Sequence, residues 1–310
     1  MPSQTTDEVD YLKNLDLLIQ ESPHDASLYS QRAAYYLDND FLLSALHDTQ
    51  KALEIDSTNT DYWLLLGDVY FKMGKFSESR SIIEKVVNQY PENMVAKLKY
   101  AEFQLYLADY PKVFNLVNEV LRQSPYNAKA YFLKGMAYLE LKDTTLALSS
   151  FQTAVDIDPD YFHAHMQIGL INSAKLQPLC VEHFKQAMRL NPLKPESYYA
   201  LGYYYQNVGR INEAIDTYKA LLYNIPGNPA ALFNLGYIYL LYKKEYPLAI
   251  QYFSEAVAVD SKYTEAYYNR GYAYELSGNK QAAIRDYQNA LALNSNFDLA
   301  LKGLKRLGMK

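Results

Sequence analysis

Histidine and cysteine side chains are the residues of this sequence best suited to metal binding or nucleophilic chemistry. Three of the five histidines, His163, His165 and His183, lie close together in the chain. A zinc-binding helix places two histidines four residues apart with a glutamate, and this cluster lacks that pattern. The single cysteine, Cys180, has no adjacent base to activate its thiol. We therefore predict no metal, no cofactor and no catalytic residue.

Aromatic residues offer a different chemistry, because tyrosine combines apolar contact with a polar end and is favoured at interfaces. Three aromatic pairs have members four residues apart, namely Tyr199 and Tyr203, Phe233 and Tyr237, and Tyr268 and Tyr272. That spacing places both rings of a pair on one side of a helix. The equivalent positions of earlier segments hold Ser30, Ala34, Leu64 and Asp68. Packing within those segments therefore does not require aromatic rings at these positions.

An internal repeat positions these residues. Prolines at 91, 125, 159, 192 and 226 follow one another at intervals of 33 or 34 residues, and glycines recur at 67, 135, 169, 202, 236 and 271. Within each interval the apolar and small residues recur at three, four and seven, which is helical spacing. Each repeat therefore predicts two helices that end near the proline, because proline cannot continue a helix.

The recurring glycines predict close contact between the two helices of a repeat, because glycine inside a helix costs about 1 kcal/mol relative to alanine. Gly202 is expected to pack against Tyr218, near Ala214. A second set lies seven residues after the first glycine position and is expected to end the first helix in a left-handed conformation: Gly74, Gly209 and Gly278.

Two arginine–aspartate combinations have the same sixteen-residue separation, Arg32 with Asp48 and Arg270 with Asp286. We predict an ion pair between the two helices of one repeat in each case. A binding site for an anion is the rarer reading, because each arginine already has a partner.

The pattern W-x-x-L-G-x-x-Y, then A-x-x-x-F, then proline resembles the tetratricopeptide repeat family. "WLLLGDVY" from Trp63 with Pro91 matches it, and "YFLKGMAY" from Tyr131 matches it with Ala147, Phe151, Ala154 and Pro159. The resemblance covers about nine-tenths of the chain and implies an all-α, right-handed solenoid. Eight repeats are expected to begin near residues 26, 60, 94, 128, 162, 195, 229 and 264. The third departs most, with Lys97, Gln104 and Val113 at consensus positions.

The resemblance assigns roles to individual positions. His165 stands where Trp63 stands in another repeat, so it is expected to pack in the core. Cys180 stands at a small-residue position and is expected to be buried and inert. In the family, the side of the first helix that carries the aromatic pairs lines a concave groove. In some members asparagines at the position of Asn234 and Asn269 hold a peptide backbone, and their amides can donate and accept together.

The two ends are expected to cover the array, since terminal repeats need a polar outer face. Residues 1–25 form a lead and a capping helix, with Thr5 and Glu8 as a capping box and four apolar residues on one side: Leu12, Leu15, Leu18 and Ile19. Residues 296–310 form a second capping helix around an array at 26–295. Its covering side is expected to carry Phe297, Leu301 and Leu304, with Asp298, Lys302 and Arg306 in water.

Composition excludes several classes of function. The net charge of -5 comes from 35 acidic and 30 basic residues without a basic stripe, so nucleic acid is not an expected partner. No apolar run is long enough for a transmembrane segment. The N-terminus lacks an export signal. We expect a cytoplasmic protein if the chain is complete, and a periplasmic or lipid-anchored protein if a signal was removed.

The resemblance implies a non-enzymatic scaffold or adaptor that binds an extended protein segment. The expected groove comprises Tyr199, Tyr203, Phe233, Asn234, Tyr237, Tyr268, Asn269 and Tyr272. A carbohydrate-binding or enzyme-associated regulatory module is the alternative, including a periplasmic lipoprotein-type component of an envelope or secretion assembly, because aromatic strips also stack on sugars. A lysine and asparagine clamp for a C-terminal carboxylate is disfavoured, since tyrosines occupy those positions. A monomer and a component of a larger complex both remain open.

Overall fold

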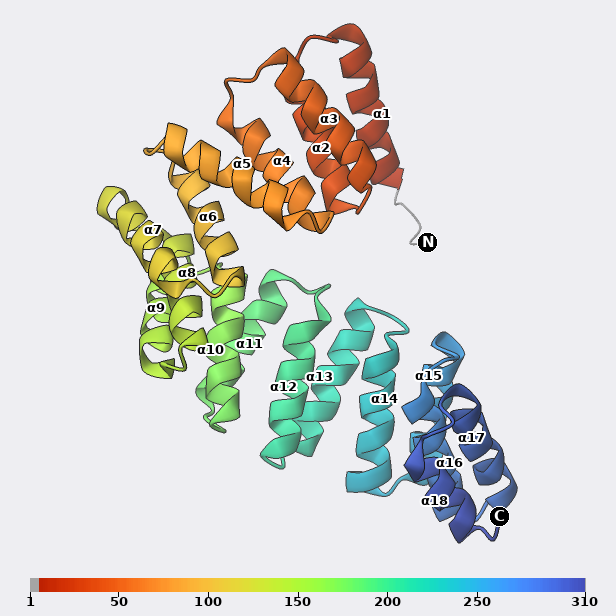
Figure 1. The fold of residues 1–310 in the computed structure, drawn as a ribbon. Coiled ribbons are helices and arrows are strands. Elements are labelled where there is room, and N and C mark those ends of the chain that lie inside the picture. The colour runs from red at the N-terminus through yellow and green to blue at the C-terminus, as the bar shows by residue number, and fades with distance from the viewer. Residues whose placement is uncertain (1–5, 310) are drawn as a thin grey trace. The chain divides into compact units, whose positions relative to one another are not determined.

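The computed structural model describes residues 6–309, and no β-strand occurs within that range. Thr5 of the expected capping box lies outside the described residues. The chain divides into two units, one up to Ile157 and one from Asp158 onward. Consecutive helices pack in pairs within each unit (Figure 1). The expected all-α fold of eight helix pairs is confirmed, and we number these pairs as repeats 1 to 8.

The first unit contains α1 and repeats 1 to 4, with the bounds α1 Thr6–Glu21, α2 Ala26–Asp38, α3 Leu42–Ile55, α4 Thr60–Lys72, α5 Phe76–Gln89, α6 Met94–Tyr106, α7 Tyr110–Gln123, α8 Ala128–Glu140 and α9 Thr144–Ile157. The second unit contains repeats 5 to 8 and a last helix, with the bounds α10 Phe162–Ala174, α11 Leu179–Leu190, α12 Pro195–Asn207, α13 Ile211–Asn224, α14 Pro229–Ile238, η1 Tyr239–Lys243, α15 Tyr246–Val259, α16 Thr264–Leu276, α17 Lys280–Leu293 and α18 Asp298–Arg306. Each repeat is therefore one first helix and one second helix.

Short polar residues start many of these helices. Asn59, Asn93, Asn127 and Asn228 each accept a backbone N–H of the first helical turn through the side-chain oxygen. This contact satisfies a donor that has no partner within the helix. The turn between the two helices contains one left-handed residue in all eight repeats: Asp40, Gly74, Ala108, Lys142, Leu176, Gly209, Lys244 and Gly278. The conformation predicted for the three glycines is thus confirmed, and the other turns adopt it without glycine.

An aromatic ring of the second helix packs directly on a glycine of the first helix in repeats 4 to 8. A Cβ atom added to Gly202 would lie 2.5 Å from Cζ of Tyr218, so the predicted contact is confirmed. Similar close approaches join Gly135 with Phe151 at 2.6 Å and Gly169 with Phe184 at 2.5 Å. The glycines therefore make room for rings that fill the core of each repeat.

A hydrogen bond ties several first helices to the loop before them. The donor lies at the position of Trp63, and the acceptor is the backbone carbonyl six residues earlier. Four repeats have this bond: Tyr29 with Pro23 at 3.2 Å, Trp63 with Ser57 at 2.9 Å, His165 with Pro159 at 2.9 Å, and Tyr198 with Pro192 at 3.2 Å. The consensus position thus combines apolar packing with a polar contact, which suits tyrosine and tryptophan.

Repeat 7 contains one extra residue. Gly236 and the left-handed Lys244 are eight residues apart, whereas Gly202 and Gly209 are seven apart. The π-helix η1 accommodates this insertion between α14 and the turn. Because the extra residue is absorbed after α14, Phe233 and Tyr237 keep the same positions relative to Gly236 as Tyr199 and Tyr203 have relative to Gly202.

The third repeat keeps both helices although its consensus positions differ. Lys97 is buried, and its ammonium group lies 2.7 Å from a carboxylate oxygen of Glu119. Gln104 and Val113 are also buried. The ion pair with Glu119 explains how a lysine can occupy a core position, since a buried charge requires a partner.

The terminal helices differ in part from the prediction. Leu15 and Ile19 of α1 are buried as expected, whereas Leu18 is exposed. At the other end Leu301 is 47% exposed, so its predicted covering role is wrong. Ala300 and Gly303 are the buried residues of α18. A Cβ at Gly303 would lie 2.5 Å from the ring of Tyr287, so a bare backbone covers that ring.

Candidate functional site

The eight predicted groove residues lie on the first helices of three consecutive repeats in the second unit. Tyr199 and Tyr203 lie on α12, Phe233, Asn234 and Tyr237 on α14, and Tyr268, Asn269 and Tyr272 on α16. The ring centroids of Phe233 and Tyr237 are 6.3 Å apart, and those of Tyr268 and Tyr272 are also 6.3 Å apart. Both pairs are stacked along their helices, as the four-residue spacing predicts.

We call Tyr199, Phe233 and Tyr268 the inner rings, because each is anchored within the fold. The hydroxyl group of Tyr199 donates a 2.6 Å hydrogen bond to Oδ1 of Asn228. Phe233 stacks on Tyr263 with a centroid distance of 5.0 Å, and its ring lies 5.6 Å from that of Phe253. These contacts hold the inner ring of each pair in a fixed position.

The contacts of the inner rings correct one part of the sequence interpretation. Tyr268 lies 5.7 Å from Tyr287 of the same repeat, and Phe233 likewise contacts Phe253 of its own repeat. Packing within repeats 7 and 8 therefore does use aromatic rings at this position. Leu64 fills the equivalent position of repeat 2, where Ile83 faces the glycine.

The second members of the pairs, Tyr203, Tyr237 and Tyr272, are the outer rings. Tyr203 is 63% exposed, and Tyr237 and Tyr272 are half-buried. The guanidinium group of Arg306 lies over the ring of Tyr272 at 5.6 Å from the centroid. Tyr203 thus presents most of its ring to solvent, whereas Tyr237 and Tyr272 expose only part of theirs and also pack against the core of repeats 7 and 8.

The two asparagines beside the rings make the same contact. Nδ2 of Asn234 donates to the carbonyl of Ala230, and Nδ2 of Asn269 donates to the carbonyl of Glu265, each at 2.8 Å. Both bonds lie within the asparagine's own helix. The side-chain oxygens accept no hydrogen bond from other described residues, so they are the atoms available to a backbone N–H.

The histidine pair is buried in repeat 5. Nδ1 of His165 lies 3.0 Å from Nδ1 of His183, and Nε2 of His165 lies 2.9 Å from the carbonyl of Pro159. A carbonyl only accepts, so Nε2–H of His165 donates to Pro159. With both rings neutral, Nδ1–H of His183 then donates to Nδ1 of His165. The predicted packing role of His165 is confirmed.

Repeat 5 also contains the single cysteine of the chain. Among the described residues, no group of three or more histidine, cysteine or acidic side chains is arranged to hold a metal. Cys180 is fully buried, and burial raises the pKa of its thiol to about 11. A thiol with a raised pKa stays protonated near neutral pH and is a poor nucleophile.

The buried pair predicts a loss of stability in mild acid. Burial lowers the pKa of His183 below its ordinary value of 6.5, and the neighbouring His165 ring adds to this because two adjacent imidazolium ions would repel each other, whereas Glu182 acts to a lesser extent in the raising direction. The unfolded chain therefore binds more protons than the folded chain as the pH falls below 6.5. We expect the melting temperature to fall more between pH 7 and pH 5 in the natural protein than in the variant His183→Thr, which copies Thr217 of repeat 6. A parallel fall in both proteins, followed by circular dichroism, would contradict this assignment.

The two arginine–aspartate pairs form as predicted. Nε of Arg32 lies 2.6 Å from Asp48, and Nε of Arg270 lies 2.7 Å from Asp286, with a second hydrogen bond in each pair. Arg32 also contacts Asp16 at 2.6 Å. Both guanidinium groups are therefore occupied by carboxylates within the fold.

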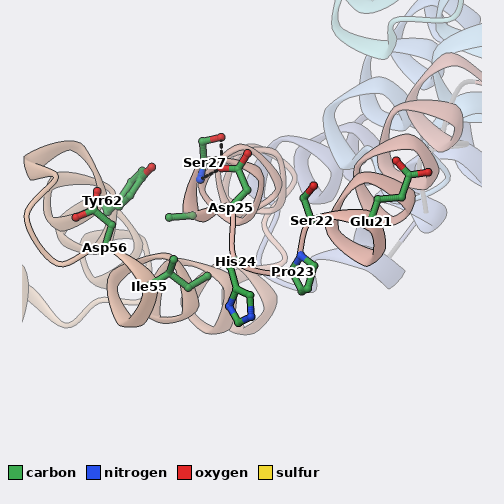
Figure 2. Close-up of a pocket in the computed structure, with 10 residues that line it drawn as sticks. Glu21, Ser22, Pro23, His24, Asp25, Ser27, Ile55, Asp56 and Tyr62 are labelled. Carbon is green, nitrogen blue, oxygen red and sulfur yellow. Dashed lines mark hydrogen bonds between the residues drawn. The ribbon is translucent and has the colours of Figure 1, made fainter.

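A hollow of about 700 Å³ lies between the loop after α1 and the loop after α3 (Figure 2). His24 and Asp25 point away from one another there. Asp25 accepts hydrogen bonds from the backbone and the hydroxyl group of Ser27, and Asp56 does the same with Thr58. These carboxylates stabilise local turns, so the hollow contains no converging set of reactive groups.

Sequence models described as tetratricopeptide repeat match residues 42–102, 128–161, 199–261 and 264–297. Anaphase-promoting complex subunit 3 of Schizosaccharomyces pombe is 22% identical over 84% of this chain and 39% of its own length. A DnaJ homolog subfamily C member 7 homolog of Dictyostelium discoideum is 25% identical over 70% of this chain and 37% of its own length. The chain thus spans about two-fifths of these relatives.

Two solved structures share the fold. The C-terminal part of a TPR repeat-containing protein from Cytophaga hutchinsonii has a TM-score of 0.65 at 19% identity, with 79% of this chain and 99% of that chain covered. The anaphase-promoting complex hetero-tetramer Cut9-Hcn1 has a TM-score of 0.53 at 19% identity, with 98% of this chain and 60% of that chain covered. Within residues 6–309, no helix has both the length and the apolar character needed to cross a bilayer.

Proposed function

This chain belongs to the tetratricopeptide repeat family, and on that premise we propose that it is a non-enzymatic scaffold that binds an extended protein segment. The proposed binding surface consists of the three aromatic pairs on α12, α14 and α16 with Asn234 and Asn269. The name of one relative, a subunit of the anaphase-promoting complex, supports a role in assemblies. Partner identity is left to experiment.

The division of each aromatic pair into an inner and an outer ring carries this proposal. An inner ring that is held by core contacts fixes its helix, and the outer ring is then presented at a defined position. Binding to such a prearranged surface orders few additional side chains, which reduces the entropic cost of association. The oxygens of Asn234 and Asn269 add acceptors for the backbone N–H groups of an extended segment.

The outer rings can be tested separately from the fold. A library of random peptides displayed on phage is selected on the natural protein, and the affinity of each selected peptide is then measured for Tyr203→Ala and Tyr237→Ala. Each substitution is expected to weaken binding by about 1 to 4 kcal/mol, the range for aromatic anchors at interfaces. The helical circular dichroism signal is expected to stay unchanged, because these rings are the outer members of their pairs.

Two control variants make this result specific. Tyr223 on α13 is 87% exposed, so Tyr223→Ala removes a still more accessible ring at another place and should leave peptide affinity unchanged. Phe233→Ala removes an inner ring and should reduce stability. If peptides bind equally well to the double variant Tyr203→Ala, Tyr237→Ala, this surface is not the peptide-binding site. Selective binding to a glycan array instead would favour the carbohydrate-binding alternative.

A further inference from the structure

Repeat 2 differs from repeats 4 to 8 in the residue that packs on the glycine of its first helix. Repeats 4 to 8 place an aromatic ring on the glycine of the first helix, whereas Gly67 of repeat 2 faces Ile83. Repeats 1 and 3 have alanine in place of the glycine, with Thr49 and Val117 at the position of Ile83. Repeat 2 is therefore the repeat that combines the space made for a ring with an aliphatic side chain.

A cavity of about 120 Å³ lies beside Ile83, between α4, α5 and α6, while Ile83 itself packs on Gly67, where an added Cβ would lie 2.9 Å from its Cγ1. Phe71, Ile83 and Phe103 form its apolar walls, and the other lining residues are polar or charged: Asp68, Ser79, Lys99 and Glu102. An apolar cavity of about 150 Å³ in another protein holds one benzene molecule. The dimensions therefore suit a single aromatic ring.

Repeat 8 shows what fills the equivalent space. Tyr287 contacts Gly271 and Gly303, and its hydroxyl group lies 2.5 Å from Glu275. Residues 204 positions apart are equivalent in repeats 8 and 2. Tyr287 therefore corresponds to Ile83, Gly271 to Gly67, Gly303 to Lys99 and Glu275 to Phe71. Lys99 and Phe71 line the cavity beside Ile83. The cavity thus corresponds to the position of the Tyr287 ring.

The hydroxyl group of Ser79 adds a polar requirement. Ser79 is fully buried, and its Oγ has no hydrogen-bond partner among residues 6–309. Alanine stands at the equivalent position of repeat 8, Ala283, so packing alone does not require the hydroxyl. Buried hydroxyl groups are almost always hydrogen-bonded, because desolvation is otherwise uncompensated. An occupant with a polar atom on its ring would supply the partner.

The surface around the cavity favours a ring that belongs to a polypeptide. Phe71, Phe76 and Tyr106 form an exposed aromatic cluster beside it, with centroid distances between 5.2 and 5.5 Å. Tyr106 is 60% exposed. Exposed aromatic clusters of this kind are typical of protein interfaces, where they surround a buried anchor.

The charges at the cavity are paired, which disfavours an ionic occupant. Lys99 forms an ion pair with Asp68, and Glu102 lies 2.9 Å from the ammonium group of Lys129. Neither sign of charge remains uncompensated at the opening. We propose that this cavity, the Ile83 pocket, receives a tyrosine side chain of a partner polypeptide. The pocket lies in the first unit, and its evidence is independent of the aromatic pairs on α12, α14 and α16.

The first experiment tests the pocket with p-cresol, which carries the tyrosine ring and hydroxyl group. The protein is labelled at its isoleucine methyl groups, and the Ile83 signal is followed by NMR during titration with p-cresol or toluene. We expect a saturable shift with p-cresol and weaker binding of toluene. Ile83→Phe copies the later repeats and should reduce p-cresol affinity at least tenfold, measured by isothermal titration calorimetry against the natural protein because this variant lacks the reporting methyl group. Ser79→Ala should remove most of the preference for p-cresol over toluene.

The second experiment tests the polypeptide source. A capped pentapeptide with a central tyrosine should produce the same shift as p-cresol, and one with a central alanine should not. Binding of p-cresol without the tyrosine peptide would overturn the polypeptide assignment. No saturable shift up to the solubility of p-cresol, or equal affinity for Ile83→Phe, would overturn the pocket itself. If Ile83→Phe does not fold, an unchanged preference in Ser79→Ala is the overturning result.

Discussion

Replacing Asp286 with alanine is expected to lower the free energy of unfolding by about 3 to 5 kcal/mol, because it leaves a largely buried guanidinium group without its partner. The Arg270 side chain is 16% exposed, and two hydrogen bonds join it to Asp286. The neutral contacts that remain are Ser254, at 3.2 Å, and the ring of Tyr267, whose centroid lies 5.4 Å from the guanidinium carbon. Urea unfolding followed by circular dichroism measures the loss.

A matched double variant separates the unpaired charge from lost packing. Repeat 6 has Leu201 and Thr217 at the positions of Arg270 and Asp286. The double variant Arg270→Leu, Asp286→Thr copies that arrangement and is expected to unfold close to the natural protein, because apolar replacement of a buried pair is often neutral. A double variant as unstable as Asp286→Ala would show that the geometry of the pair itself stabilises repeat 8.

Phe151→Ala is expected to cost about 3 to 5 kcal/mol, the usual loss for removing a buried phenylalanine ring. Phe151 is fully buried, and a Cβ at Gly135 would lie 2.6 Å from its ring. Gly135 has no side chain that could fill the space left by the ring. The part of the stability loss that comes from the remaining cavity should therefore be large. Denaturant unfolding of the natural protein and the variant measures this loss.

The control for this prediction is Phe151→Ile, which gives repeat 4 the combination of glycine and isoleucine found in repeat 2. It should cost less than Phe151→Ala, because isoleucine retains most of the buried apolar surface. It should also bind toluene more tightly than the natural protein does, measured for both proteins by isothermal titration calorimetry. Equal unfolding free energies for Phe151→Ile and the natural protein would mean that the ring is not required by Gly135.

Repetition made much of the fold predictable from the sequence. The glycines and the aromatic residues fifteen to seventeen positions later recur together, so the contact inferred for Gly202 and Tyr218 also holds in other repeats. The sixteen-residue separation likewise predicted the partner of Arg270. Each position can be compared with the equivalent positions of the other repeats, so a pattern that is weak in one repeat becomes informative in the whole set.

Features that occur once could not be predicted in this way. The exposure of Leu301 depends on how α18 meets Tyr287, and the covering residue is Gly303, which no side-chain pattern indicates. The inner position of Phe233 depends on a contact with Tyr263, which lies in the loop before the next repeat. The combination of Gly67 with Ile83 was visible in the sequence, but its cavity requires the distance between helices.

The tie between each first helix and its preceding loop has a consequence for how such an array changes during evolution. In repeat 6 both ends of the tie, the carbonyl of Pro192 and the hydroxyl group of Tyr198, lie within six residues. A duplication or deletion with its boundary just before the proline moves donor and acceptor together. A copied segment therefore contains both the donor and the acceptor of this hydrogen bond. The number of repeats can change without selection for a new contact at that junction.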